Sequence, residues 1–158
     1  MNHLVLKAIH VLSVALFLGN IITGIFWKAH ADNLGDLRAR AQALDGIIKA
    51  DRLFSLPAVI LIIVTGAWMA NISHIPLLGL NWAALGLYLF GTTGVIFQFF
   101  VGPLQKKLLV NTRNGLSGTC DEAQYQRLSR QWQIWGGIAT LLPIIIVFLM
   151  VLKPDLGS

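Results

Sequence analysis

Acidic side chains are scarce in this chain and are missing from its apolar stretches. Only seven Asp and Glu residues occur among 158, and none lies between Asp51 and Asp121. Proton-coupled pumps and transporters usually place a carboxylate inside the membrane. The missing carboxylates therefore argue against that class of protein.

Cysteine and the common catalytic motifs are also nearly absent. The single Cys120 excludes an internal disulfide framework, and it lies in a polar segment. The chain has no glycine-rich phosphate loop, no HExxH, no CxxCH and no nucleophile elbow. None of the enzyme classes that these motifs define is indicated.

What the chain has in excess is apolar side chains. Hydrophobic residues make up 56% and charged residues 12%, more apolar surface than a water-soluble domain of this size could bury. Four runs reach the length of roughly 20 residues that a helix needs to cross the hydrocarbon layer. We therefore predict a single all-α membrane domain over 1–158, a four-helix bundle with spans at about 4–27, 53–73, 82–101 and 132–152.

The segments between the spans carry their own helical signals. Between the first two, apolar residues recur every three or four positions from Leu34 to Ile48 among charged residues, which predicts a short amphipathic helix on the cytoplasmic membrane surface. The short uncharged connection 71–80 predicts that the second and third spans pack as a hairpin. Thr119 and Glu122 have the spacing of a capping box that would start the fourth helix.

Basic residues are concentrated in two segments. Ten of the twelve Lys and Arg residues lie within 28–52 and 106–130, and the net charge is +5. The positive-inside rule places both segments in the cytoplasm and both termini outside. We expect a multi-pass protein of the bacterial inner membrane, whose basic excess meets anionic lipid rather than nucleic acid.

The first span contains two ionisable residues one turn apart, Lys7 and His10. An ionisable group inside a membrane helix costs roughly 2.5–3.5 kcal/mol, so a partner, cavity or cofactor usually offsets it. Ser13, Phe17 and Asn20 lie within about a quarter turn of His10. We predict that this polar face points into the bundle.

Neutral imidazole is a common ligand of metals and of haem iron, so His10 is a candidate axial ligand of haem b. Ser13 and Asn20 would offer hydrogen bonds to the bound group, and Lys7 could pair with a propionate. A sixth iron ligand would come from Met69 or His74, near the outer end of the second span, unless the iron is five-coordinate.

Two other interpretations remain open. His3, His10 and His74 could form a copper or other non-haem metal site on the outer side. The chain could also be a structural or assembly protein of the membrane, without a cofactor. A homodimer, which would bury more helix surface, is a further expectation for so small a bundle.

Short motifs in chain order resemble HemJ, a family of haem-dependent protoporphyrinogen oxidases, and the outline is similar to the copper-resistance CopD group. They are Lys7-Ala8-Ile9-His10, Arg52-Leu53, Pro57-Ala58 and Val151-Leu152-Lys153-Pro154. The resemblance implies haem at His10, redox or porphyrin-handling chemistry, and a porphyrin or quinone-type electron partner. HemJ proteins carry a lysine and histidines in the third span, where this chain has Tyr88 and Gln98, so Lys7 and Tyr88 are the candidate catalytic residues.

The charge asymmetry predicts the orientation of the chain in the membrane. Alkaline phosphatase, which is active only outside the cytoplasm, is expected to be active when fused after Ser158 and inactive when fused within 106–130. Activity only in the second fusion would reverse the topology and move His10 to the inner leaflet.

Overall fold

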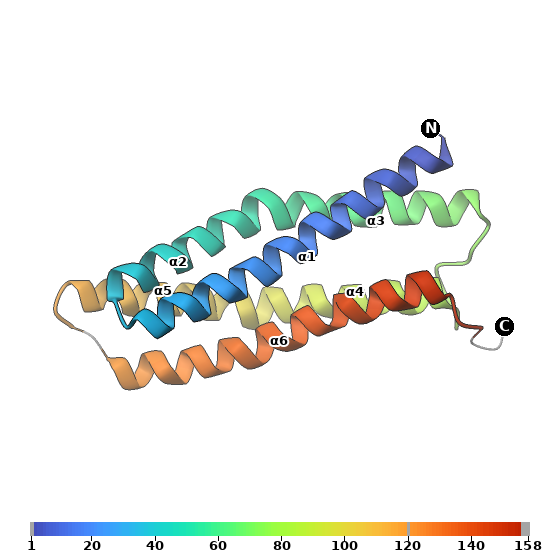
Figure 1. The fold of residues 1–158 in the computed structure, drawn as a ribbon. Helices are drawn as coiled ribbons and strands as arrows, with labels where there is room; N and C mark the ends of the chain where they lie inside the picture. Colours follow the sequence, from blue (N-terminus) through green and yellow to red (C-terminus); the bar gives the residue numbers. More distant parts are fainter. Residues whose placement is uncertain (1, 120, 156–158) are drawn as a thin grey trace.

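The fold is an all-helical bundle, obtained as a computed structural model that describes residues 2–119 and 121–155. The thiol of Cys120 lies outside the described residues. Four long helical rods follow one another along the chain (Figure 1): α1 (His3–Leu34); α2 (Leu37–Ala50), η1 (Asp51–Ser55) and α3 (Leu56–Ile72); α4 (Trp82–Ile96), η2 (Phe97–Val101) and α5 (Gly102–Leu116); and α6 (Glu122–Leu152).

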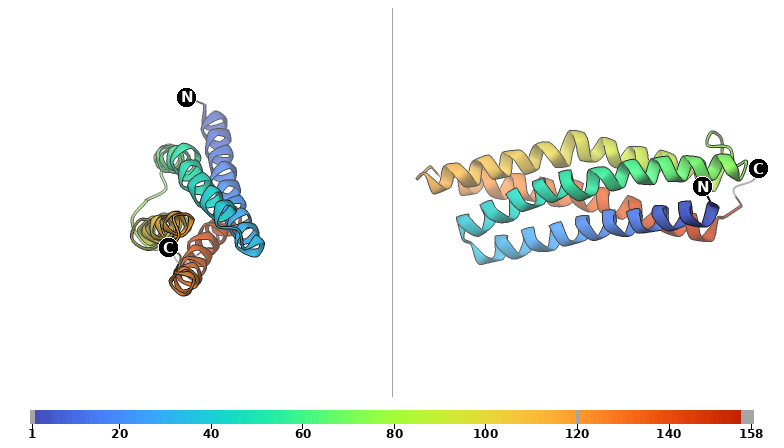
Figure 2. Two further views of the ribbon diagram at one scale, coloured as in Figure 1. Left: turned by 90° about the vertical axis from the view of Figure 1, so that its left-hand side faces the viewer. Right: turned by 90° about the horizontal axis from the view of Figure 1, so that it is seen from above.

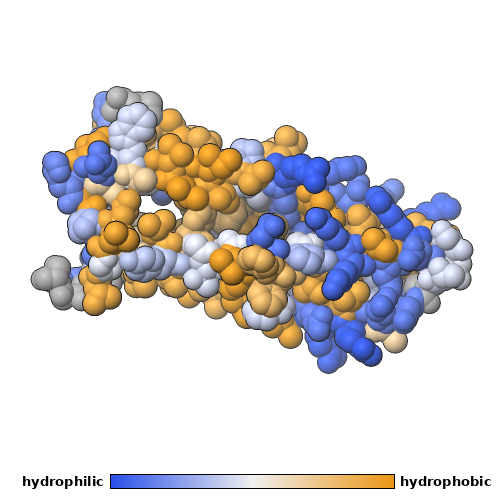
Figure 3. All heavy atoms as spheres, turned by 180° about the vertical axis from the view of Figure 1, so that it is seen from behind, coloured by the Kyte–Doolittle hydropathy of each residue, from blue (hydrophilic) through white to orange (hydrophobic). Residues whose placement is uncertain are grey.

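All four rods are long and apolar enough to cross a membrane, which confirms the predicted all-α membrane architecture. They are also longer than the hydrocarbon layer needs, since the 32 residues of α1 span about 48 Å. Hydrophobic residues cover the end of the molecule that holds both termini, and hydrophilic residues gather at the opposite end (Figures 1 and 3). We refer to these as the outer and the inner end.

Polar side chains at loop positions start the helices. Asn2, Asp36 and Asn81 each accept a hydrogen bond from a backbone N–H of the first helical turn, as N-caps do. The predicted capping box of Thr119 is wrong. Asp121 caps α6 by accepting from the backbone N–H of Gln124, whereas the Thr119 hydroxyl donates to the carbonyl of Asn114.

Two of the rods contain a π-helical turn just before a proline. η1 ends at Ser55, two residues before Pro57, and η2 ends at Val101, two residues before Pro103. Proline has no N–H to donate, so a regular α-helix would leave a carbonyl one turn earlier without its partner. The wider turn carries each helix past this point without ending it.

The helices pair differently from the predicted hairpin of the second and third spans. α3 packs chiefly against α1, and α4 packs against α6 (Figures 1 and 2). The connection 73–81 is short, yet it only bridges the two pairs at the outer end. A short loop constrains where two helices start, but side-chain packing decides what they lie against.

The amphipathic helix predicted after the first span exists as α2, but it is not a separate surface helix. It continues through η1 into α3, and it packs along α5. Leu44 and Ile47, on its apolar face, are buried. The apolar stripe therefore meets protein, where lipid head groups were expected.

The bundle is closed at its inner half and split at its outer half. A buried cluster that includes Leu44, Leu108 and Trp132 fills the inner half. Farther out, the edge-on contact of Phe17 with Phe90, with ring centroids 5.8 Å apart, joins α1 to α4. An opening among hydrophobic residues is visible toward the outer end (Figure 3).

Candidate functional site

His10 lies in the outer half of α1, and its imidazole faces α3. Its Nδ1 is 2.9 Å from the hydroxyl oxygen of Thr65, a residue that is 3% exposed. The Thr65 hydroxyl in turn donates its hydrogen to the carbonyl oxygen of Leu61. A hydroxyl has only one hydrogen, so toward His10 it acts as an acceptor and Nδ1 must be the donor. The second ring nitrogen, Nε2, therefore keeps its lone pair.

Gly66 gives the imidazole its place against α3. A Cβ atom added at Gly66 would lie 3.2 Å from Cε1 and 3.7 Å from Nδ1 of His10. The first distance is tighter than ordinary packing, so a larger residue would press on the ring. Gly66 and Thr65 together therefore set both the position and the tautomer of His10.

The predicted polar face of α1 does point inward, but its members have different partners. Ser13 is buried and donates to the carbonyl of Ile9 in its own helix. Asn20 lies about 15 Å along α1 from His10 and donates to Asp51 at 3.0 Å. The structure thus assigns Asn20 to a second polar group of the bundle, centred on Asp51.

The other predicted site residues lie nearer the surface. Lys7 and His74 are exposed, and His74 has a positive φ of 54° in the outer loop. Met69 is half-buried one turn beyond Thr65, and Tyr88 is exposed on α4. Among the described residues, no three His, Cys, Asp or Glu side chains are grouped to hold a metal ion. The copper site predicted from His3, His10 and His74 is therefore not assembled.

Asp51 is brought into the bundle by the π-helical turn that it begins. Its Oδ1 accepts from Asn20 of α1 and, at 3.3 Å, from the Ser55 hydroxyl, and its Oδ2 accepts from Nε2 of Gln105 at 3.2 Å. From the sequence alone, Asp51 fell just outside the second span. In the structure it joins α1, η1 and α5 where their polar side chains meet.

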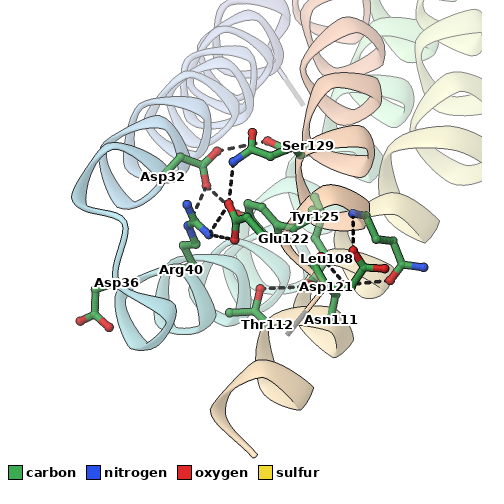
Figure 4. Close-up of polar contacts among 12 residues, drawn as sticks. Asp32, Asp36, Arg40, Leu108, Asn111, Thr112, Asp121, Glu122, Tyr125 and Ser129 are labelled. Atoms are coloured by element: carbon green, nitrogen blue, oxygen red, sulfur yellow. Dashed lines mark hydrogen bonds and ion pairs between the residues drawn. The ribbon is translucent and has the colours of Figure 1, made fainter. Parts of the chain in front are cut away.

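A separate polar group, the inner charged cluster, closes the inner end of the bundle (Figure 4). Lys28, only 1% exposed, donates to Oδ2 of Asp32 at 2.6 Å and to the Ser129 hydroxyl at 2.7 Å. Oδ1 of Asp32 accepts from the Tyr125 hydroxyl at 2.5 Å. The cluster comprises Lys28, Asp32, Arg40, Glu122, Tyr125 and Ser129.

Arg40 extends this cluster to the start of α6. Its Nη1 donates to both carboxylate oxygens of Glu122, at 2.9 and 3.2 Å, and its guanidinium carbon lies 4.5 Å from the centre of the Tyr125 ring. Two buried cations thus face two carboxylates, and a buried cation without a partner would be costly. These ion pairs and hydrogen bonds hold α1, α2 and α6 together.

Most of the inner charged cluster was not predicted from the sequence. Lys28 and Asp32 have the i, i+4 spacing of a helical ion pair, which was the one available signal. Ser129, which accepts from Lys28, lies 101 residues later in the chain. No local pattern shows that α1 and α6 meet there.

The fold and these polar groups define a four-span integral membrane protein with buried ionisable residues. The chain belongs to the family described as predicted integral membrane protein (DUF2269), whose profile matches residues 4–154. Comparisons with curated proteins and with solved structures found no match. The HemJ-like and CopD-like resemblances therefore stay predictions.

The inner charged cluster predicts that two similar ion pairs differ in their effect on stability. Lys28–Asp32 and Asp45–Lys49 are both i, i+4 pairs at 2.6 Å, but the Lys28 side chain is 1% exposed and the Lys49 side chain 76%. Lys28→Met should lower the free energy of unfolding by about 3 kcal/mol, because it removes the buried cation of the pair and leaves Asp32 and Ser129 without their donor.

Lys49→Met is the matched control and should leave the unfolding midpoint nearly unchanged, since water screens an exposed pair. Denaturant titration of both variants in detergent measures the difference. Equal effects would mean that the inner charged cluster does not hold the bundle together.

Proposed function

We propose that this protein binds haem b through Nε2 of His10 and acts as a redox or porphyrin-handling protein of the bacterial inner membrane. In this proposal both termini are outside and His10 lies in the outer leaflet. The observation that carries it is the His10–Thr65–Leu61 hydrogen-bond chain. With Nδ1 as the donor to Thr65, the lone pair of the neutral imidazole is on Nε2.

Ligand geometry supports the proposal. A histidine that ligates a metal almost always donates its other ring N–H to a protein oxygen, which orients the ring and selects the tautomer. Thr65, buried on α3, supplies the oxygen that accepts from Nδ1 of His10. A histidine with a purely structural role would more commonly satisfy both nitrogens.

Space at the outer end also supports the proposal. The α1–α3 pair and the α4–α6 pair separate there, and the opening between them is lined by hydrophobic residues (Figure 3). A porphyrin is large, flat and mostly apolar, so such a surrounding suits it. Phe17 and Phe90 join α1 to α4 farther inward than His10.

In this proposal the bound iron supplies a centre that accepts and releases one electron. The protein would orient His10 through Thr65, and Gly66 leaves room for the imidazole of His10 against α3. The Phe17–Phe90 contact would shield the site from the inner half. Lys7 would meet a propionate at the outer surface. Met69 and His74 remain candidates for the second axial position, and a membrane-soluble porphyrin or quinone-type molecule for the electron partner.

An optical spectrum of the purified, haem-reconstituted protein tests the proposal. The wild type should show a Soret band, and His10→Ala should lose it because the iron ligand is gone. His3→Ala and His30→Ala should keep the band. Absence of haem from the wild type, or a normal spectrum of His10→Ala, would favour a structural or assembly role.

A second pair of variants tests the role of the hydrogen bond. Thr65→Val should weaken haem affinity by roughly 10- to 100-fold, as loss of an outer-shell partner does, while keeping the band at saturating haem. Thr92→Val is the matched control, because the Thr92 hydroxyl is exposed and only donates to the carbonyl of Tyr88 in its own helix. Equal affinities of the two variants would contradict the role given to Thr65.

A further inference from the structure

The carboxyl group of Asp51 differs from those of Asp32 and Glu122 in the partners it has. Asp32 and Glu122 face Lys28 and Arg40, so their negative charge is matched by a buried cation. Asp51 has hydrogen bonds only with neutral side chains, those of Asn20, Ser55 and Gln105. Among the described residues it takes part in no ion pair.

These neutral partners can serve either protonation state. Ser55 carries a hydroxyl, and Asn20 and Gln105 carry amides, so each can donate to a carboxylate or, after rotation, accept from a carboxylic acid. A lysine or arginine in their place could only donate and would hold the group ionised. The side chains of Gln105 and Ser55 are both buried, so water takes little part in this change of hydrogen-bond direction.

Among the described residues, no charged side chain forms a hydrogen bond or an ion pair with Asp51. The groups that meet it are Asn20 from α1, Ser55 from η1 and Gln105 from α5. Charged residues close to Asp51 or Gln105 in the sequence are exposed; these include Lys49, Arg52 and Lys106. The site is therefore isolated from the inner charged cluster, about 12 Å away along α1 from Asn20 to Lys28.

A groove on the surface leads to this site from the inner end. It lies between α1 and α2, has a volume of about 480 Å³, and runs from Leu34 and Ala39 to Asn20 and Ala50. Small residues keep it open, including Gly24, Ala43 and Gly46. The groove ends at Ala50, the residue before Asp51, and at Asn20, whose amide donates to the Asp51 carboxylate.

We propose that Asp51 is a proton-binding site, loaded from the inner side through the groove between α1 and α2. The proton adds to one carboxylate oxygen, and the neighbouring hydroxyl or an amide oxygen accepts the new O–H. This site is separate from any haem at His10, since Asn20, the residue of α1 that donates to Asp51, lies about 15 Å along that helix from His10. It gives the protein a proton-binding carboxyl group at the inner edge of its membrane helices.

Dicyclohexylcarbodiimide, a membrane-soluble reagent, tests the proposal directly. The O–H of a protonated carboxyl adds across one C=N bond of the reagent, with the oxygen bonding to carbon and the proton passing to nitrogen. Treatment of the wild type in lipid vesicles, followed by peptide mass spectrometry, should place the adduct on Asp51. The labelling rate should rise as the pH is lowered. An adduct only on other carboxyl groups, or a rate at Asp51 that is independent of pH, would overturn the proposal.

Variants confirm the site and the route. Asp51→Asn keeps the size of the side chain and should abolish the adduct, while Asp45→Asn, at an exposed ion pair, should retain it. An added Cβ meets no atom within 4 Å at either Gly46 or Gly91, so Gly46→Phe can block the groove and Gly91→Phe on α4 is its control. Slower labelling only in Gly46→Phe is expected, and unchanged labelling there would overturn the route. Should Asp51→Asn fail to fold, the mapped adduct of the wild type still decides the matter.

Discussion

A lysine buried at the inner end is the constraint on which the arrangement of this bundle depends. Lys28 is 1% exposed, and such a charge persists in a protein interior only with close partners. Asp32 supplies the opposite charge and Ser129 a further acceptor, while Tyr125 and Arg40 complete the group around Asp32. Because these residues come from α1, α2 and α6, satisfying the charge draws three rods together.

Closure at one end allows separation at the other. Outside the inner charged cluster and the Asp51 group, the rods are held mainly by apolar contacts, with the His10–Thr65 hydrogen bond between α1 and α3, and α1–α3 and α4–α6 form the two main pairs. Apolar helices gain little from one another in lipid, since lipid tails are equally apolar. The outer half can therefore leave the opening seen in Figure 3 at low cost.

The two polar groups of the inner half have different chemistry because their partners differ. Asp32 meets the cation of Lys28, and its contacts with Tyr125 and Ser129 join α1 to α6. Asp51 meets hydroxyl and amide groups, which suit a carboxylate and a carboxylic acid equally. The π-helical turn at Asp51 turns this side chain toward α1 and α5, which a search for carboxylates within apolar runs could not detect.

The sequence by itself determined four membrane helices, an amphipathic helix before the second one, and an inward face of α1 that carries His10 and Asn20. Each of these follows from the length or the periodicity of a local run of residues. The tertiary structure decided that α3 lies against α1, that Thr65 accepts from His10, and that Lys28 meets Ser129. Periodicity shows which face of a helix is buried, but apolar helices and lipid look alike in hydropathy. Which helix covers that face depends on side-chain packing and on hydrogen bonds between residues far apart in the chain.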